Sequence, residues 1–263
     1  MMTGLGTAAA IALGISQTVY LGAMVTLGVR LALLARRTRQ LPEALLSAHF
    51  LLCCTVGYSL QGSGYALAIE PGASHALVAT LLYVGNGASL LGIAAVLVFN
   101  YRVFRSGTRL GQGLLAGCIA LLVVGYAGSA ASGGFAHGRP EGFWFWALYS
   151  AFTAASVWTL VEPLVYFAGL RKRQRIGLAD PLVVDRFLLW GIGSVARFAM
   201  LAIGAVAMLQ LTGAASDLAA VAAPTFLASG LAGIVVAISY GLAFFPPRAY
   251  LRRVERRSAS ARA

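Results

Sequence analysis

Clusters of basic residues alternate with long uncharged apolar runs along this chain, and this alternation constrains the fold more than any other feature. The sequence has 20 Lys and Arg residues, and nearly all of them fall within residues 36–39, 102–109, 171–186 and 248–262. Lys and Arg are retained on the cytoplasmic side of short membrane loops. Because the clusters occupy every second gap between apolar runs, they predict an odd number of crossings, with the N-terminus outside and the C-terminus in the cytoplasm.

The composition excludes an ordinary soluble domain. Of the 263 residues, 59% are hydrophobic and 11% are charged, and the mean hydropathy is +0.81. A bilayer core of about 30 Å requires about 20 apolar residues per helix, and the chain has seven such stretches. The predicted fold is therefore an all-α integral membrane bundle of seven transmembrane helices. The net charge is +12, and the basic residues border these stretches. This placement favours a signal for membrane topology, so no nucleic-acid partner is predicted.

The predicted domain organisation is a transmembrane domain, residues 1–247, followed by a basic cytoplasmic tail, residues 248–263. The first charged residue is Arg30, so the first apolar run lacks the basic start of a cleaved signal peptide and is predicted to remain as a span. Pro246 and Pro247 end the last helix, and the tail is predicted to lie along the membrane as an amphipathic segment. The predicted spans are approximately residues 8–34, 44–69, 76–100, 110–131, 143–170, 187–211 and 218–245.

Small residues within the spans predict close helix contacts. Gly113 and Gly117 form a small-xxx-small pair in the fourth span, and Gly85 and Gly92 are suitably spaced in the third. Helix packing in lipid depends on close backbone approach, which glycine permits. We therefore expect both pairs to face neighbouring helices.

Two ionisable residues, Glu162 and Arg197, lie well inside predicted spans. Inserting such groups costs about 2.5–3.5 kcal/mol, so each is a functional candidate. Counted from the cytoplasmic ends of the fifth and sixth spans, both lie about 12–16 Å deep. Their matched depth and opposite charge predict an ion pair. Such a pair has two interpretations, a structural link between two helices and a polar centre of a ligand or proton pathway.

Aromatic and polar side chains accompany these two residues and form the candidate ligand-binding set. Those on the fifth span lie one turn to either side of Glu162, and those on the sixth share a face with Arg197. Amides and phenols in the outer half of the bundle predict either hydrogen bonds between helices or a cavity that opens outward. The set comprises Trp158, Glu162, Tyr166, Trp190, Ser194, Arg197, Gln61, Tyr65 and Asn86.

Several chemistries lack the residues they need. Retinal requires a lysine in the last span, and Lys172 lies in a predicted loop, so no retinal or other cofactor is predicted. His49 is alone near the inner end of the second span, which disfavours haem. Cys53, Cys54 and Cys118 are interpreted as small residues at helix contacts, with no metal site. No catalytic constellation is recognised, so the chain is not predicted to be an enzyme.

Three stretches resemble a group of uncharacterised bacterial seven-helix membrane proteins. They are Arg-Arg-Thr-Arg-Gln-Leu-Pro-Glu at 36–43, Phe-Arg-Ser-Gly at 104–107, and Ala-Asp-Pro-Leu-Val-Val-Asp-Arg-Phe-Leu-Leu-Trp-Gly at 179–191. The ending Ala-Phe-Phe-Pro-Pro-Arg-Ala-Tyr-Leu-Arg at 243–252 is similar to the point where bacterial membrane sensor modules leave the bilayer. The latter resemblance implies an output through a separate partner. The candidate docking residues are Arg36, Arg37, Arg39, Arg105, Asp180 and Arg186.

Three functions follow as hypotheses for a multi-pass protein of the bacterial inner membrane, a location favoured by the preference for Arg over Lys and the abundance of Ala and Gly. The first is a receptor-like sensor that binds a small apolar or amphipathic ligand within the bundle and signals to a cytoplasmic protein. The second is a transporter or permease subunit with Glu162 and Arg197 in its path. The third is an accessory structural subunit whose main partner is the lipid bilayer.

Overall fold

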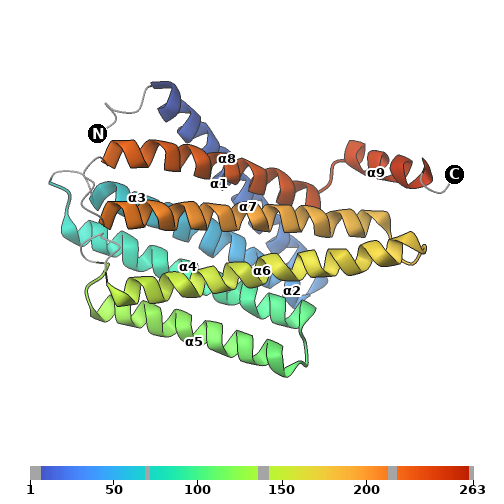
Figure 1. Ribbon diagram of the computed structural model, residues 1–263, viewed down its shortest axis with the longest axis horizontal. Coiled ribbons are helices and arrows are strands. Elements are labelled where there is room, and N and C mark those ends of the chain that lie inside the picture. The colour runs from blue at the N-terminus through green and yellow to red at the C-terminus, as the bar shows by residue number, and fades with distance from the viewer. Residues whose placement is uncertain (1–6, 69–71, 136–141, 213–217, 261–263) are drawn as a thin grey trace.

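The computed structural model describes the chain except for residues 1–6, 69–71, 136–141, 213–217 and 261–263. The predicted end of the second span and the last residues of the tail therefore lie outside the described residues. The described part is built of helices joined by short connections (Figure 1). These elements are α1 (Thr7–Thr38), α2 (Leu41–Ala48), η2 (His49–Gly57), α3 (Tyr58–Ala68), α4 (His75–Phe104), α5 (Arg109–Ala131), α6 (Phe143–Arg175), α7 (Pro181–Thr212), α8 (Leu218–Phe244) and α9 (Arg248–Ser260).

Within the described residues, seven helical segments are long and apolar enough to cross a membrane, which confirms the prediction of a multi-pass membrane protein. The second segment is a continuous rod in which the π-helix η2 lies between the α-helices α2 and α3. Several helices extend past the apolar spans predicted within them, most clearly α6 and α7. Helix α6 continues past residue 170 to Arg175, and α7 already begins at Pro181.

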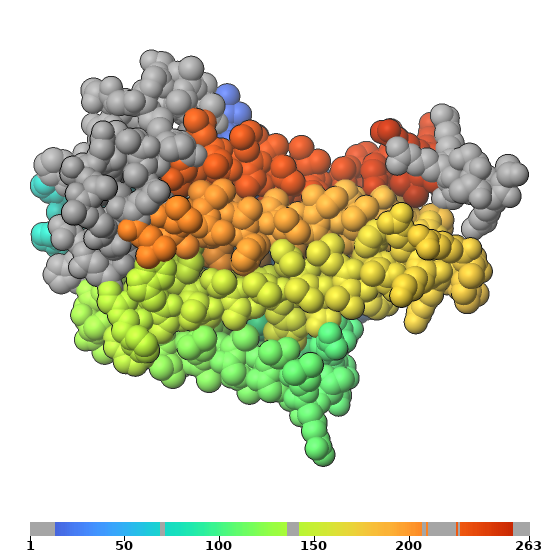
Figure 2. All heavy atoms as spheres, viewed as in Figure 1, coloured from blue at the N-terminus to red at the C-terminus, as the bar shows by residue number. Residues whose placement is uncertain are grey.

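Helices that follow one another in the sequence pack side by side in a ring, and contacts between α1 and α8 close this ring. Helix α4 contacts the second rod, α5 and α6, and it has the largest buried share of the seven spans. The ends of the helices that carry Arg36, Arg105, Arg173 and Arg248 define what we call the basic end of the bundle. At this end, the hairpin of α6 and α7 extends beyond the other spans and lies beside α9 (Figures 1 and 2).

Glycines determine where the spans approach most closely. A Cβ added at Gly92 would lie 2.5 Å from the backbone nitrogen of Cys53, and one at Gly85 would lie 2.9 Å from that of Gln61. These contacts confirm the expectation that Gly85 and Gly92 face a neighbouring helix, which is the second rod. The expectation for Gly113 and Gly117 is wrong, because an added Cβ at either position meets nothing within 4 Å. Helix α5 packs through another face, where Gly125 abuts the backbone of Leu148.

Candidate functional site

The π-helix η2 brings together three residues that are unremarkable as a sequence pattern. In an α-helix, a residue five positions along lies about 140° away around the axis. In a π-helix, with about 4.4 residues per turn, positions i+4 and i+5 both lie within about 50° of position i. Cys53 and Cys54 therefore flank His49 on one face. The Thr55 hydroxyl donates to the Phe50 carbonyl, also five residues back, at 2.9 Å.

His49 is held in one orientation by helix α4. Its Nδ1 atom lies 2.9 Å from the carbonyl oxygen of Gly92. A carbonyl oxygen can only accept a hydrogen bond, so Nδ1 carries the proton and Nε2 presents its lone pair. The Cys54 Sγ atom lies 3.5 Å from that Nε2. His49 and Cys54 are each only 2% exposed, so this arrangement lies in the interior of the bundle.

Arg197 of α7 completes this group, which we call the thiol cluster (His49, Cys53, Cys54 and Arg197). One of its terminal nitrogens donates to His49 Nε2, and the other lies 3.5 Å from Cys53 Sγ. Among the described residues, no carboxylate lies at salt-bridge distance from this guanidinium. A buried cation without a carboxylate is costly in a membrane, so the imidazole and thiol groups are its immediate polar partners.

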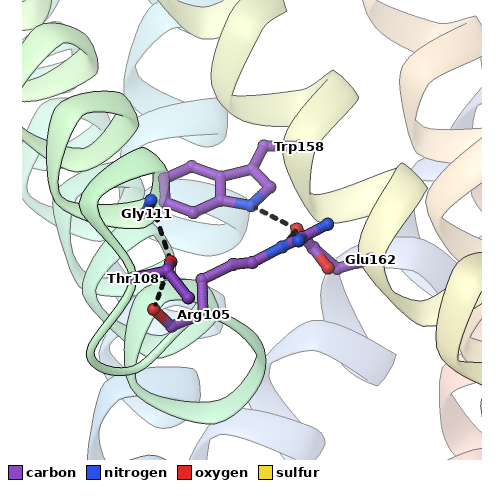
Figure 3. Close-up of polar contacts among 5 residues, drawn as sticks. All are labelled: Arg105, Thr108, Gly111, Trp158 and Glu162. Atoms are coloured by element: carbon purple, nitrogen blue, oxygen red, sulfur yellow. Dashed lines mark hydrogen bonds and ion pairs between the residues drawn. The ribbon is translucent and has the colours of Figure 1, made fainter.

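Glu162 has a different partner, Arg105, which is the C-cap residue of α4. The Arg105 Nε atom donates to Glu162 Oε1 at 2.7 Å, and Trp158 Nε1 donates to the same oxygen at 3.0 Å (Figure 3). The Glu162 side chain is 7% exposed and that of Arg105 is 36% exposed. This ion pair joins the end of α4 to the middle of α6, close to the basic end of the bundle.

The turn that carries Arg105 is itself well ordered by hydrogen bonds. The Thr108 hydroxyl donates to the Arg105 carbonyl at 2.8 Å and accepts from the Gly111 backbone nitrogen at 3.1 Å, which caps helix α5 (Figure 3). Gly107 has a φ of 78°, a left-handed conformation that glycine adopts without strain. A few residues deeper, Asn100 donates to the Thr159 hydroxyl at 2.9 Å. Helices α4 and α6 are therefore linked twice by side chains.

The predicted ion pair between Glu162 and Arg197 is thus wrong. The prediction counted depth from the ends of the apolar runs, but α6 and α7 continue as helices beyond the other spans. Glu162 lies level with the end of α4, where Arg105 reaches it. Arg197 lies seven residues beyond Trp190 on α7, or about 10 Å farther along the helix. Its neighbours there are His49 and Cys53.

The other members of the predicted ligand set are spread over several contacts. Tyr166 and Trp190 both pack against Phe187, with ring centroids 4.6 and 5.9 Å away, and both also contact Phe104 at the end of α4. Ser194 hydrogen-bonds the Tyr240 hydroxyl at 3.1 Å. The remaining three lie on α3 and α4.

Those three side chains make local contacts. Gln61 donates to the Ser89 hydroxyl at 2.7 Å, and Asn86 donates to the Leu82 carbonyl on its own helix at 2.8 Å. Tyr65 packs against the apolar core between α4 and α6. Among the described residues, then, the predicted set does not gather around one centre.

The candidate docking residues lie at the basic end. Arg36, Arg37, Arg39 and Arg186 are exposed, whereas Arg105 is engaged with Glu162. Asp180 is exposed as well, and its carboxylate accepts from the Leu182 backbone nitrogen at 2.8 Å, which caps α7. Exposed basic side chains therefore gather at this end of the bundle.

Sequence reasoning missed the thiol cluster. It treated His49 as isolated and the two cysteines as packing residues, because a π-helix leaves no simple signature in residue type. The spacing of four between His49 and Cys53 was the one available signal, since residues four apart share a helix face.

Comparison of the chain with protein-family models, with curated proteins and with solved structures finds no match.

Proposed function

We propose that this protein is a receptor-like membrane sensor in which the thiol cluster is the detecting site and α7 carries the response to the basic end. The observation that supports this most is the position of Arg197. It contacts the second rod through His49 and Cys53, and it belongs to the helix that forms the projecting hairpin with α6. A change at the cluster therefore acts directly on the helix that reaches the hairpin.

Features of the hairpin fit an output surface. It carries Arg171, Lys172, Arg173 and Arg175 beyond the main body of the bundle, and α9 lies beside it. We propose that a cytoplasmic protein with an acidic surface docks there, because opposite charges steer such encounters. The proposal requires the basic end to face the cytoplasm. Reporter tags on the two chain ends should therefore be protected in opposite compartments, and protection in the same one would exclude it.

The ligand predicted from sequence was apolar or amphipathic, and that remains a prediction. The groups gathered around Arg197 are polar and include two thiols, which favours a ligand that reacts with or coordinates sulfur. The transporter alternative gains no support, because Glu162 and Arg197 lie in separate contacts. The accessory-subunit alternative also remains a prediction.

Amide hydrogen exchange at the hairpin tests the sensor proposal. We expect Arg197→Gln to change the exchange rate of the amides at residues 176–182 at least about threefold in lipid nanodiscs, because α7 loses its polar link to the second rod. Val195→Ala is the matched control, since that side chain is 47% exposed on the same helix. Identical exchange in the two variants would exclude coupling through α7.

A further inference from the structure

The thiol cluster has the donor set of a soft-metal site. His49, Cys53 and Cys54 each offer one ligand atom, and these atoms all lie within 4.8 Å of one another. Metal–sulfur and metal–nitrogen bonds of about 2.3 and 2.0 Å, at angles between tetrahedral and trigonal, separate the two donor atoms by about 3.6 Å. The observed distance from Cys54 Sγ to His49 Nε2 is 3.5 Å. The pair is thus already at coordination spacing.

The imidazole is also prepared for this role. Metal-binding histidines characteristically donate their other ring N–H to a carbonyl or carboxylate, which fixes the ring and its tautomer. Gly92 supplies that carbonyl at 2.9 Å. Gly92 also lets α4 approach Cys53 within a distance that a larger residue would not permit. Helix α4 therefore orients one ligand and positions another.

Charge selects among the metals that thiols prefer, which include Cu⁺ and Zn²⁺. Two thiolates and one Cu⁺ carry a net charge of −1, which the guanidinium of Arg197 would neutralise. Two thiolates and one Zn²⁺ carry no net charge, which would leave Arg197 as an uncompensated cation. Since uncompensated charge is costly in the interior of a membrane bundle, a monovalent ion suits this cluster better.

We propose that His49, Cys53 and Cys54 bind one Cu⁺ ion, and that binding moves Arg197 away from His49. Each thiol releases its proton to solvent when its sulfur coordinates the metal, so one Cu⁺ replaces two protons. In this structure, Arg197 donates to the Nε2 lone pair of His49, which the metal would need for coordination. One lone pair cannot accept from the guanidinium and coordinate Cu⁺ at the same time. This inference rests on the proposed function, because the displaced side chain belongs to α7. It names the ligand that the sensor would detect.

Competition with a chromogenic Cu⁺ chelator under anaerobic conditions tests the site. We expect one ion per chain for the purified protein in nanodiscs, and at least about tenfold weaker binding for Cys53→Ser, Cys54→Ser and His49→Gln. Cys118→Ser is the matched control, because Cys118 lies on α5 outside the cluster, and its binding should be unchanged. Retention of full affinity by the Cys53→Ser/Cys54→Ser double variant would overturn the proposal.

A measurement on the unaltered protein avoids the risk that a variant misfolds. X-ray absorption at the copper edge should show two sulfur ligands and one nitrogen ligand. A shell without sulfur, or tighter binding of Zn²⁺ than of Cu⁺, would overturn the proposal. Failure of the metal proposal is distinguishable from failure of the sensor proposal, since the hydrogen-exchange effect of Arg197→Gln requires no metal.

Discussion

The two interior arginines of this bundle illustrate opposite ways of placing a cation in a membrane protein. Arg105 ends a helix, remains 36% exposed and pairs with a carboxylate that also accepts from an indole. Arg197 lies within a helix and contacts an imidazole and a thiol, with no carboxylate at salt-bridge distance among the described residues. The first cation is neutralised by a fixed charge. The second is surrounded by groups whose charge can change.

This difference separates a structural contact from a candidate switch. The Arg105 pair joins groups of opposite charge in direct contact, and it links α4 to α6. At the Arg197 site, the proposed binding of Cu⁺ would replace two thiol protons and would alter what the guanidinium contacts. Glu162, a functional candidate by sequence, therefore belongs to the more structural of the two sites.

The largest expected effect is on the structural side of this comparison. Arg105→Leu should lower the free energy of unfolding by about 3–5 kcal/mol, because it leaves the buried Glu162 carboxylate without its cation. Tryptophan fluorescence in mixed micelles measures the unfolding, and Trp158, whose indole donates to the same carboxylate, contributes to the signal with the other three tryptophans of the chain.

Substitution of the other partner in the ion pair is the control. Glu162→Gln should cost only about 1 kcal/mol, because Arg105 is partly exposed and can turn towards solvent or lipid headgroups. Equal losses for the two variants would mean that both partners are equally dependent on the pair. The asymmetry in their burial would then have no energetic consequence.

The number and order of the spans could be predicted because they depend on short-range composition. Each apolar run is long enough to cross a bilayer, and each basic cluster marks the same end of the bundle, so seven segments follow from counting. The extension of α6 and α7 could not be predicted in this way, since the residues from Arg171 to Arg175 are too polar for a span although they continue the helix. Helix length and apolar length are different quantities.

The sites were less predictable than the spans. The depth of Glu162 depended on that unpredicted extension, and its partner Arg105 was assigned to a loop. The thiol cluster depended on a change of helical repeat over nine residues, which rotates Cys54 towards His49. Hydrophobic periodicity carries no information about such a change, because every residue from Phe50 to Gly57 is apolar or small.

A medium effect is expected where α4 approaches the cluster. Gly92→Ala should lower the free energy of unfolding by about 1–3 kcal/mol, because the new Cβ would lie 2.5 Å from the nitrogen and 2.6 Å from the Cβ of Cys53. The backbone of η2 would have to shift, so Cu⁺ affinity should fall as well. Gly117→Ala is the matched control on the outer face of α5. It should leave stability unchanged or raise it by up to about 1 kcal/mol through helix propensity.

The smallest effect on stability is expected at Arg197 itself. Arg197→Leu removes two hydrogen-bond donors from the cluster, at a cost of about 1–2 kcal/mol, but it also removes a cation that costs about 2.5–3.5 kcal/mol to insert. The second contribution exceeds the first, so the free energy of unfolding should rise by about 0.5–2.5 kcal/mol. Hydrogen exchange at the hairpin should nonetheless lose its dependence on Cu⁺. A loss of stability as large as that of Arg105→Leu would instead show that Arg197 holds the bundle together, and the contrast between the two arginines would disappear.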